Sequence, residues 1–389
     1  MDITAAIIYY CFINFILIYW IRGELLMFVY PKNYDDAKKE FIELTDELKK
    51  QGYHLFKSQF EISDGLFIDK VVIKAKKEAK NRIVFSSGLH GIEGFVGHCA
   101  IKHFVTTMIN TLSDETEIVI YHTLNPYGMK HLRRSNENNI DLNRNFSSNN
   151  FSNENKAYKK AIDFFTPVTY KGIKTANIAY YKNIGKAILK HGSETFKEAT
   201  LLGQNSFAEG IYYSGKTFEK STIYMLNEFN NLFNDVGKLV YIDLHTGYGP
   251  RYQMSVVNSL GDKYQTINMK KECDYPLILG EDSTDFYDID GDMIEKLYLI
   301  KREKYPNIDF YGTCFEFGTL GDSTKKTIES LKAMIFENAS FFKPQTENFV
   351  IYSDKLMREQ YMPSEEEWRK KANLDFNKAL KEIVKFKNI

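Results

Sequence analysis

The sequence predicts an α/β domain in which helices cover both faces of a central β-sheet. Two observations support this prediction. Short apolar segments with strand character alternate along the chain with longer helical segments, which is typical of α/β proteins. Clusters of polar residues follow several of the apolar segments directly, as functional loops do at the carboxyl ends of strands in such sheets. With 389 residues, 43% of them hydrophobic, the chain is long enough to bury a substantial core.

The first predicted element is an amphipathic helix over residues 34–51. Phe41, Leu44 and Leu48 recur there at helical spacing, and Gly52 follows at the position where a helix commonly ends. Five later segments are short, apolar and rich in β-branched or aromatic residues, which predicts strands. These strands are expected over residues 66–74, 82–87, 116–124, 239–246 and 312–319.

Helices are predicted between and after these strands. An apolar helix is expected over 92–109, and the polar, helix-prone region 150–236 has no evident core strand, so we interpret it as a helical insertion. The chain closes with a C-terminal helix after Pro363, where Ser364 and Glu367 have the spacing of a capping box. No internal repeat or Pro/Gly linker divides the chain, which favours a single catalytic domain.

The N-terminus differs in composition from the rest. Residues 3–21 carry no charge, and a helix of this length would span roughly 28 Å, close to the hydrocarbon thickness of a bilayer. We therefore predict that 1–26 holds a single membrane anchor. Basic residues that begin at Arg22 would keep the domain 27–389 in the cytoplasm. The alternative is that translation starts at Met27 and that the protein is soluble and cytoplasmic.

Charge and cysteine content exclude several classes of protein. Lys plus Arg and Asp plus Glu both number 51, so the formal charge is zero and nothing indicates nucleic acid as a partner. The four cysteines are widely spaced, which argues against a disulfide framework, and they form no CxxC metal motif. The nucleotide motifs GxxxxGK[ST] and GxGxxG and the hydrolase motif GxSxG are all missing from the sequence. Function must come from a local site.

The stretch "GLHGIEG" (88–94) directly follows a predicted buried strand. His90 and Glu93 lie three residues apart among three glycines, which let the backbone turn tightly so that both side chains face one centre. The HxxE spacing alone is weak evidence for a metal site. His191 and Glu194 have the same spacing, but they fall in a lysine-rich helical stretch with no strand before them, so we interpret that pair as surface residues.

A catalytic zinc site needs a third protein ligand and an open position for water. His245 in "DLHTG" ends another predicted strand of the same sheet and is the natural candidate. Considered by itself, a histidine at a strand end is more often a structural residue whose ring is hydrogen-bonded. The other polar clusters favour the metal site over this alternative.

Four motifs follow one another along the chain: the HxxE pair, "NPYG…RRSN…IDLNRNF" (125–146), "DLHTG", and Glu316 in "FEFGT". As an ordered set they resemble the zinc carboxypeptidase superfamily, the carboxypeptidase A-like metallopeptidases. "GLHGIEGFVG", "GQNSFAEGIYYSG" (203–215) and a late Pro-x-x-x-x-Trp resemble an uncharacterised branch of that superfamily, known as a domain of unknown function. The resemblance covers roughly 35–380 and implies a mixed central sheet with zinc as the cofactor.

The resemblance also implies roles for individual residues in the catalytic centre. His90, Glu93 and His245 match the zinc ligands, and Glu316 matches the general base. Asp141 matches the carboxylate that orients the first zinc-binding histidine, a partner that metal-bound imidazoles generally require.

Further roles concern the substrate. Asn143 and Arg144 match the pair that clamps a substrate's terminal carboxylate, which a planar guanidinium can hold with two hydrogen bonds. Arg134 matches the arginine that polarises the scissile carbonyl, although the adjacent Arg133 is an alternative. The family's mobile tyrosine has no evident match, and Tyr287 is one of many candidates.

These residue types suit amide hydrolysis, because zinc activates water and a carboxylate can take the proton from it. The main hypothesis is a zinc metallocarboxypeptidase acting on peptides. The alternatives are an N-acyl amino acid deacylase of the aspartoacylase type and a non-catalytic zinc- or peptide-binding module. A structural alternative for Arg144 and Glu316 is a buried salt bridge that supports the sheet, although such pairs add little net stability.

Overall fold

The computed structural model describes residues 27–149, 151–152, 154–260, 262–280 and 290–389. The predicted membrane segment 3–21 and the candidate Tyr287 lie outside these ranges, so both stay predictions. Among the helices that the structure describes, none combines the length and the apolar character needed to cross a bilayer.

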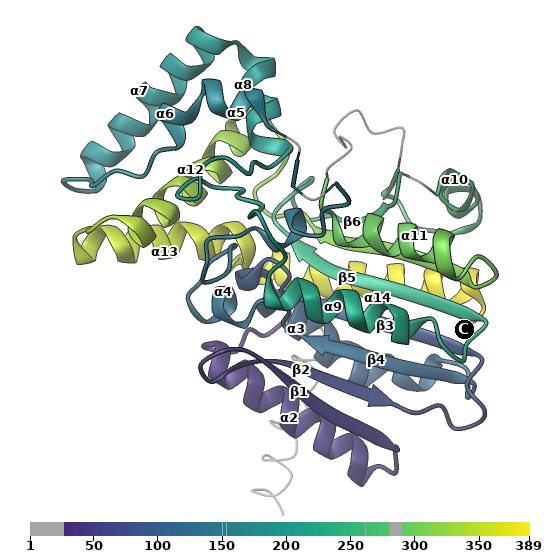
Figure 1. The fold of residues 1–389 in the computed structure, drawn as a ribbon. Coiled ribbons are helices and arrows are strands. Elements are labelled where there is room, and N and C mark those ends of the chain that lie inside the picture. The colour runs from purple at the N-terminus through teal and green to yellow at the C-terminus, as the bar shows by residue number, and fades with distance from the viewer. Residues whose placement is uncertain (1–26, 150, 153, 261, 281–289) are drawn as a thin grey trace, which may run out of the picture.

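A mixed eight-stranded sheet forms the centre of the described chain, which confirms the predicted fold class (Figure 1). Its strand order is β1-β2-β4-β3-β5-β8-β6-β7. The central strands β4, β3, β5 and β8 run parallel to one another, whereas β2 and β6 pair antiparallel with β4 and β8. The strands are β1 (Leu55–Ser63), β2 (Leu66–Ile73), β3 (Asn81–Ser87), β4 (Thr116–His122), β5 (Lys238–Thr246), β6 (Met254–Asn258), β7 (Ile278–Leu279) and β8 (Asp309–Phe317).

All five predicted strands are present as β2, β3, β4, β5 and β8. The four parallel strands β3, β4, β5 and β8 are largely apolar, because helices cover both faces of this part of the sheet. The three strands that the sequence analysis did not identify, β1, β6 and β7, lie at or near the two edges. β1 is largely exposed and polar, and β7 has only two residues, so neither carries a strong strand signal.

Alternating residues along β3 show how both faces of the sheet are used. Ile83 and Phe85 belong to one core, with α2, α3 and α14, whereas Val84 belongs to the other core, with α9 and α11. The α-helices are α2 (Tyr34–Lys50), α3 (Gly94–His103), α4 (Pro126–Lys130), α5 (Lys156–Lys160), α6 (Ile162–Phe165), α7 (Ile173–His191), α8 (Ser193–Leu201), α9 (Lys220–Leu232), α10 (Lys263–Glu272), α11 (Met293–Lys304), α12 (Thr324–Phe342), α13 (Glu347–Tyr361) and α14 (Glu366–Lys387).

The region predicted as an insertion divides into two parts. Helices α5 to α8 lie together beyond one end of the sheet, alongside α12 and α13 (Figure 1). Helix α9 falls in the same range of the sequence but packs on the sheet, because its buried Met225 and Phe229 join the core on that face.

Two details of the predicted helices are wrong. The apolar helix expected over 92–109 is interrupted, because α3 is preceded by the 3-10 helix Gly91–Glu93 and followed by a π-helical turn at Phe104–Met108. The expected capping box does not form, since α14 begins one residue later than Ser364 would require, with Glu365 as its N-cap and no side-chain cap bond. Contacts of Glu365 with Arg251 and Tyr252 hold it there.

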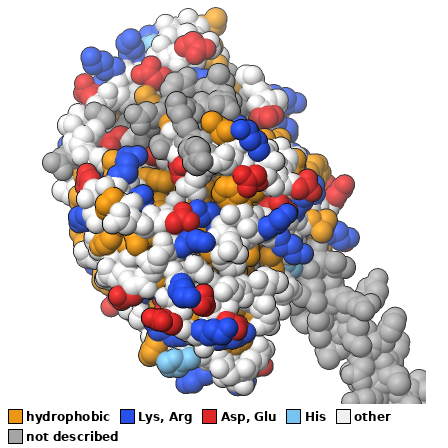
Figure 2. Space-filling view, turned by 90° about the vertical axis from the view of Figure 1, so that its right-hand side faces the viewer, with side chains coloured by type: hydrophobic (Ala, Val, Ile, Leu, Met, Phe, Trp, Pro, Cys, Tyr) orange, Lys and Arg blue, Asp and Glu red, His pale blue; other side chains and the backbone are white. Residues whose placement is uncertain are grey.

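Acidic and basic side chains alternate over the face shown in Figure 2, as the balanced composition leads one to expect. Hydrophobic side chains appear between them as small separate patches. Among the described residues on this face, no extended area carries a single charge.

Candidate metal centre

The turn after β3 places His90 and Glu93 side by side. Gly88 adopts a left-handed backbone with φ of +64°, a conformation that favours glycine. Gly91 lies so close to the backbone of Gly128 that an added Cβ would come within 2.3 Å of it. A tight turn of this kind buries both His90 and Glu93 almost completely. Gly88 and Gly91 therefore permit the tight turn that the sequence analysis predicted, whereas Gly94 has helical backbone angles at the start of α3.

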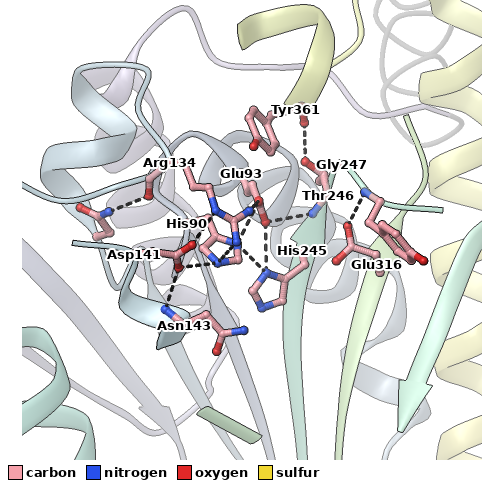
Figure 3. A network of polar contacts seen from close by, with 12 residues as sticks. His90, Glu93, Arg134, Asp141, Asn143, His245, Thr246, Gly247, Glu316 and Tyr361 are labelled. Atoms are coloured by element: carbon pink, nitrogen blue, oxygen red, sulfur yellow. Dashed lines mark hydrogen bonds and ion pairs between the residues drawn. The ribbon is translucent and has the colours of Figure 1, made fainter. Parts of the chain in front are cut away.

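His245 lies next to this turn because β5 pairs with β3 in parallel, so both strands end at the same edge of the sheet. Its Nδ1 atom is 3.2 Å from Nδ1 of His90 and 3.1 Å from Glu93 Oε2. The remaining distance, from His90 Nδ1 to Glu93 Oε1, is 3.0 Å. Three potential ligand atoms thus converge on one point, although 155 positions separate the two histidines in the sequence (Figure 3).

Each histidine binds a carboxylate through its outer nitrogen. His90 Nε2 lies 3.1 Å from Asp141, and His245 Nε2 lies 2.6 Å from Asp243, which in turn accepts a 2.6 Å hydrogen bond from Ser86. At His245, the Asp243 carboxylate accepts the Nε2 proton, which favours the tautomer with a lone pair on Nδ1 toward the centre. At His90, Nε2 also lies 2.7 Å from Nη2 of Arg134, which is always a donor. Asp243 was missed by the sequence analysis. Its signal was available, since residues two apart on a strand share one face.

The charges around the centre favour the ionised carboxylates. Burial opposes ionisation of Glu93, but His90 and His245 outweigh it and lower the pKa of Glu93. Burial likewise opposes ionisation of Asp141, but Arg134 and His90 hold the pKa of Asp141 well below its usual value. Burial of His245 favours its neutral form, yet the adjacent Asp243 raises the pKa of His245 well above its usual range.

The residues present fit a divalent metal ion. Two imidazole nitrogens and a carboxylate oxygen whose mutual distances stay within 4.8 Å could bind one cation, with a further position open. A second group in the described chain, formed by Asp243, His245 and Cys314, meets the same distance criterion. The first group fits better, because in the second His245 would have to use the nitrogen that already binds Asp243.

The two adjacent arginines have different surroundings. Arg134 lies at the centre, with Nε 2.9 Å from Asp141 and Nη1 3.5 Å from Glu93. Arg133 points away and forms a buried ion pair with Glu337 of α12. Of the two alternatives that the sequence left open, only Arg134 reaches the metal-ligand candidates.

Glu316 lies beside the candidate ligands on β8. It is the register partner of His245, and its carboxylate accepts a 2.9 Å hydrogen bond from the backbone N–H of Tyr248. Burial and the neighbouring Glu93 raise the pKa of Glu316 above its usual value. The side chain is partly exposed, so solvent or a substrate can reach it.

Asn143 and Arg144 occupy the short 3-10 helix that follows Asp141. The side chain of Asn143 is already bound to the start of α11: its amide donates to Asp292 at 2.9 Å, and its oxygen accepts from the Met293 N–H at 2.9 Å. Arg144 is buried, and the carboxylates of Asp141 and Asp292 stabilise its positive charge. Arg144 therefore lies close to the centre, whereas the side-chain amide of Asn143 is hydrogen-bonded to the start of α11.

Comparison with known proteins identifies the family. The sequence pattern of the family described as "Protein of unknown function (DUF2817)" matches residues 30–374. The chain belongs to this family. The match confirms the resemblance to an uncharacterised branch, and no curated protein matches the chain.

Several solved structures are similar to this DUF2817 protein at low sequence identity. Bovine thrombin-activatable fibrinolysis inhibitor, in complex with tick carboxypeptidase inhibitor, is 14% identical, with a TM-score of 0.48 over 82% of this chain and 98% of that one. Carboxypeptidase A from Helicoverpa armigera is 14% identical, with a TM-score of 0.46 over 80% and 74%. Succinylglutamate desuccinylase from Chromobacterium violaceum is 9% identical, with a TM-score of 0.35 over 80% and 74%.

Two tyrosines of this DUF2817 protein also border the centre and were missed by the sequence analysis. The ring of Tyr212 lies 5.8 Å from the guanidinium carbon of Arg134. Tyr361, at the end of α13, accepts a 2.6 Å hydrogen bond from Thr246 through its backbone oxygen. No local pattern marks either residue, because each reaches the centre from a distant part of the chain.

Proposed function

We propose that this DUF2817 protein is a metal-dependent hydrolase of amide bonds next to a free carboxylate, most simply a zinc metallocarboxypeptidase. One observation carries the proposal: His90, Glu93 and His245 converge within coordination range, and a carboxylate, Glu316, lies beside them in register. A structural metal site is usually closed by four protein ligands, whereas three ligands and a nearby base are typical of catalysis.

Glu316 acts as the general base in this proposal. When bound, zinc supplies a Lewis acid that activates water and polarises the amide carbonyl. Glu316 takes the proton of the attacking water and later delivers it to the leaving amine. The raised pKa of Glu316 supports this role, because a base poised near neutral pH can both accept and return a proton.

The arginines are assigned to the two negative charges of the reaction. Arg134 donates hydrogen bonds to the former carbonyl oxygen as negative charge develops there, and removal of such a donor typically slows a reaction about 10²- to 10³-fold. Arg144 binds the substrate's carboxylate. We assign Asn143 a supporting role, since its amide already holds the start of α11.

The deciding experiment is an activity screen of the zinc-loaded protein. Peptides with free C-termini, the same peptides as C-terminal amides, and N-acyl amino acids separate the three functions. Cleavage of the free peptides alone supports the carboxypeptidase, and cleavage of N-acyl amino acids alone supports the deacylase. Metal binding without turnover of any substrate class would support the non-catalytic module and contradict the proposal.

The first prediction concerns Glu316→Gln. The substitution keeps the size of the side chain but removes the base, so we expect kcat to fall about 10²- to 10⁴-fold, while zinc stays bound near one ion per chain. Initial rates and metal analysis of the same preparations measure both quantities. Unchanged turnover would show that Glu316 does not act in the reaction.

A further inference from the structure

Helix α7 (Ile173–His191) lies at the outer edge of the helical insertion, away from the sheet (Figure 1). Its inner side is held by buried residues at helical spacing, namely Ala176, Tyr180, Ile184 and Ala187. The hydroxyl of Tyr180 also donates a 2.6 Å hydrogen bond to the backbone oxygen of Ile328 in α12. This packing fixes which side of α7 faces solvent.

The solvent side of α7 carries large apolar side chains. Leu189 is 89% exposed, the highest value among the large hydrophobic residues of the described chain, and Ile178 is 60% exposed. The two residues lie about three helical turns apart, so both belong to one line along the helix. Tyr181, 48% exposed, lies next to this line. We call the side formed by Ile178, Tyr181 and Leu189 the outer face of α7.

The outer face is also basic. Helix α7 contains no Asp or Glu, and it has four exposed lysines, Lys174, Lys182, Lys186 and Lys190. Lys174 and Lys182 lie four positions from Ile178, and Lys186 lies three positions from Leu189, so the charges adjoin the apolar side chains.

These lysines differ from lysines elsewhere in the chain. Among the described residues, none of the four has an ion-pair partner. In α2, by contrast, Lys39 and Lys50 pair with Glu43 and Glu47. The chain as a whole has a formal charge of zero, so the unpaired positive charge of α7 is a local feature.

An apolar line bordered by unpaired lysines fits the surface of an anionic lipid bilayer. Apolar side chains of such a helix enter the headgroup region, while long lysine side chains reach the lipid phosphates beside them. An acidic protein is the alternative partner. A peptide segment needs a groove to bury its side chains, whereas the outer face is the convex surface of a helix at the edge of the molecule and suits a flat surface.

We propose that the outer face of α7 binds the surface of anionic lipid bilayers, with Ile178 and Leu189 in the headgroup region and the four lysines at the phosphates. The inference goes beyond the proposed function, because it involves no residue of the candidate metal centre. It is also independent of the predicted membrane segment 3–21, which lies outside the described residues.

The test places a fluorescent reporter on the outer face of the full chain. Leu189→Trp puts an indole at a position that is exposed, so the fold should not change. The parent has two tryptophans, and its spectrum is subtracted. The remaining emission should shift to shorter wavelength with vesicles of mixed phosphatidylcholine and phosphatidylglycerol. Vesicles of phosphatidylcholine alone should leave it unchanged, because they have no net charge to attract the lysines.

A charge variant tests the role of the lysines in the same reporter protein. Lys182→Gln combined with Lys186→Gln should raise the lipid concentration at the half-maximal shift roughly 30-fold, because each charge contributes about fivefold. The matched control, Lys76→Gln combined with Lys77→Gln, removes the same charge from the exposed segment between β2 and β3. It should bind the anionic vesicles as the reporter protein does.

Several outcomes would overturn the inference. One is an unchanged emission of the Leu189→Trp protein with anionic vesicles, and another is an equal shift with phosphatidylcholine alone. An equal loss of binding in the two double variants would show that only total charge matters. A shift with soluble polyglutamate but not with vesicles would instead support an acidic protein as the partner. None of these measurements involves zinc or turnover, so failure of the proposed function is a separate result.

Discussion

Two pairs of residues in this chain share the spacing HxxE but have different surroundings. His90 and Glu93 follow a buried strand and are at most 5% exposed. His191 and Glu194 lie where α7 ends and α8 begins, and Glu194 is exposed. A third protein group, His245, faces the first pair.

The comparison shows that spacing alone does not define a metal site. Two potential ligands three residues apart can approach each other in any tight turn. They form a metal site only where another strand end places a further ligand atom next to them. The first pair meets this condition because β3 and β5 end together. The second pair lies among helices that hold no comparable group among the described residues.

The largest expected effect tests this comparison directly. His245→Ala removes one of three ligands, so we expect bound zinc to fall from near one ion per chain to near zero. His191→Ala should keep the full content. Metal analysis after dialysis, with circular dichroism to check folding, measures the difference. Equal zinc content in the two variants would contradict the assigned site.

The adjacent residues Arg133 and Arg134 are of one type but have different surroundings. Arg134→Gln should lower kcat about 10²- to 10³-fold, and it should also destabilise the fold, because Asp141 loses its partner in a buried ion pair. Arg133→Gln should cost about 3–5 kcal/mol in the free energy of unfolding, because it leaves Glu337 buried without its partner, but it should leave kcat of the folded protein close to the wild-type value. Steady-state kinetics and urea unfolding of both variants separate the two effects, and a reversed pattern would exchange the roles.

Asp243→Asn tests whether the outer carboxylate matters for the metal. Loss of such a partner typically weakens metal affinity about 10- to 100-fold, because the imidazole is less basic and less well oriented. Competition with a chelator of known affinity gives the dissociation constant. Asp262→Asn, at the start of α10, is a control acidic position away from the centre. An unchanged dissociation constant would leave Asp243 a purely structural residue.

Burial of a histidine is not enough for a metal site either, as His98 and His122 show. Nδ1 of His98 lies 3.1 Å from Nε2 of His122. Burial lowers the pKa of both residues, so both are neutral in the folded protein at neutral pH. Unfolding raises these pKa values toward about 6.5, so the unfolded state binds more protons below that pH. Stability should therefore fall as the pH drops from about 7 to 5.

His122→Gln isolates this smaller effect. Each such histidine contributes up to about 1.4 kcal/mol per pH unit to the slope, so the variant should lose less stability between pH 7.5 and pH 5.5 than the wild type. Urea unfolding at the two pH values measures the difference. Equal slopes in the variant and the wild type would mean that His122 titrates similarly when folded and unfolded.

Much of the fold could be predicted because its signals are local. The central strands are apolar over their whole length, which reflects burial on both faces, and glycines mark the turn at His90. The edge strands β1 and β7 could not be predicted, since exposure removes the apolar pattern and leaves pairing to the neighbouring strand. The start of α14 was misjudged because contacts of Glu365 with the segment before β6 decided it.

The candidate site shows the same division. Local patterns are enough to predict the fold class and the residue types that gather at strand ends, because strand periodicity and glycine turns act over a few residues. Packing between distant segments settles that Arg134 rather than Arg133 faces the ligands and that Tyr212 reaches the centre from the insertion. Side-chain direction and burial depend on packing between distant segments, so neighbouring residues of one type can have opposite surroundings.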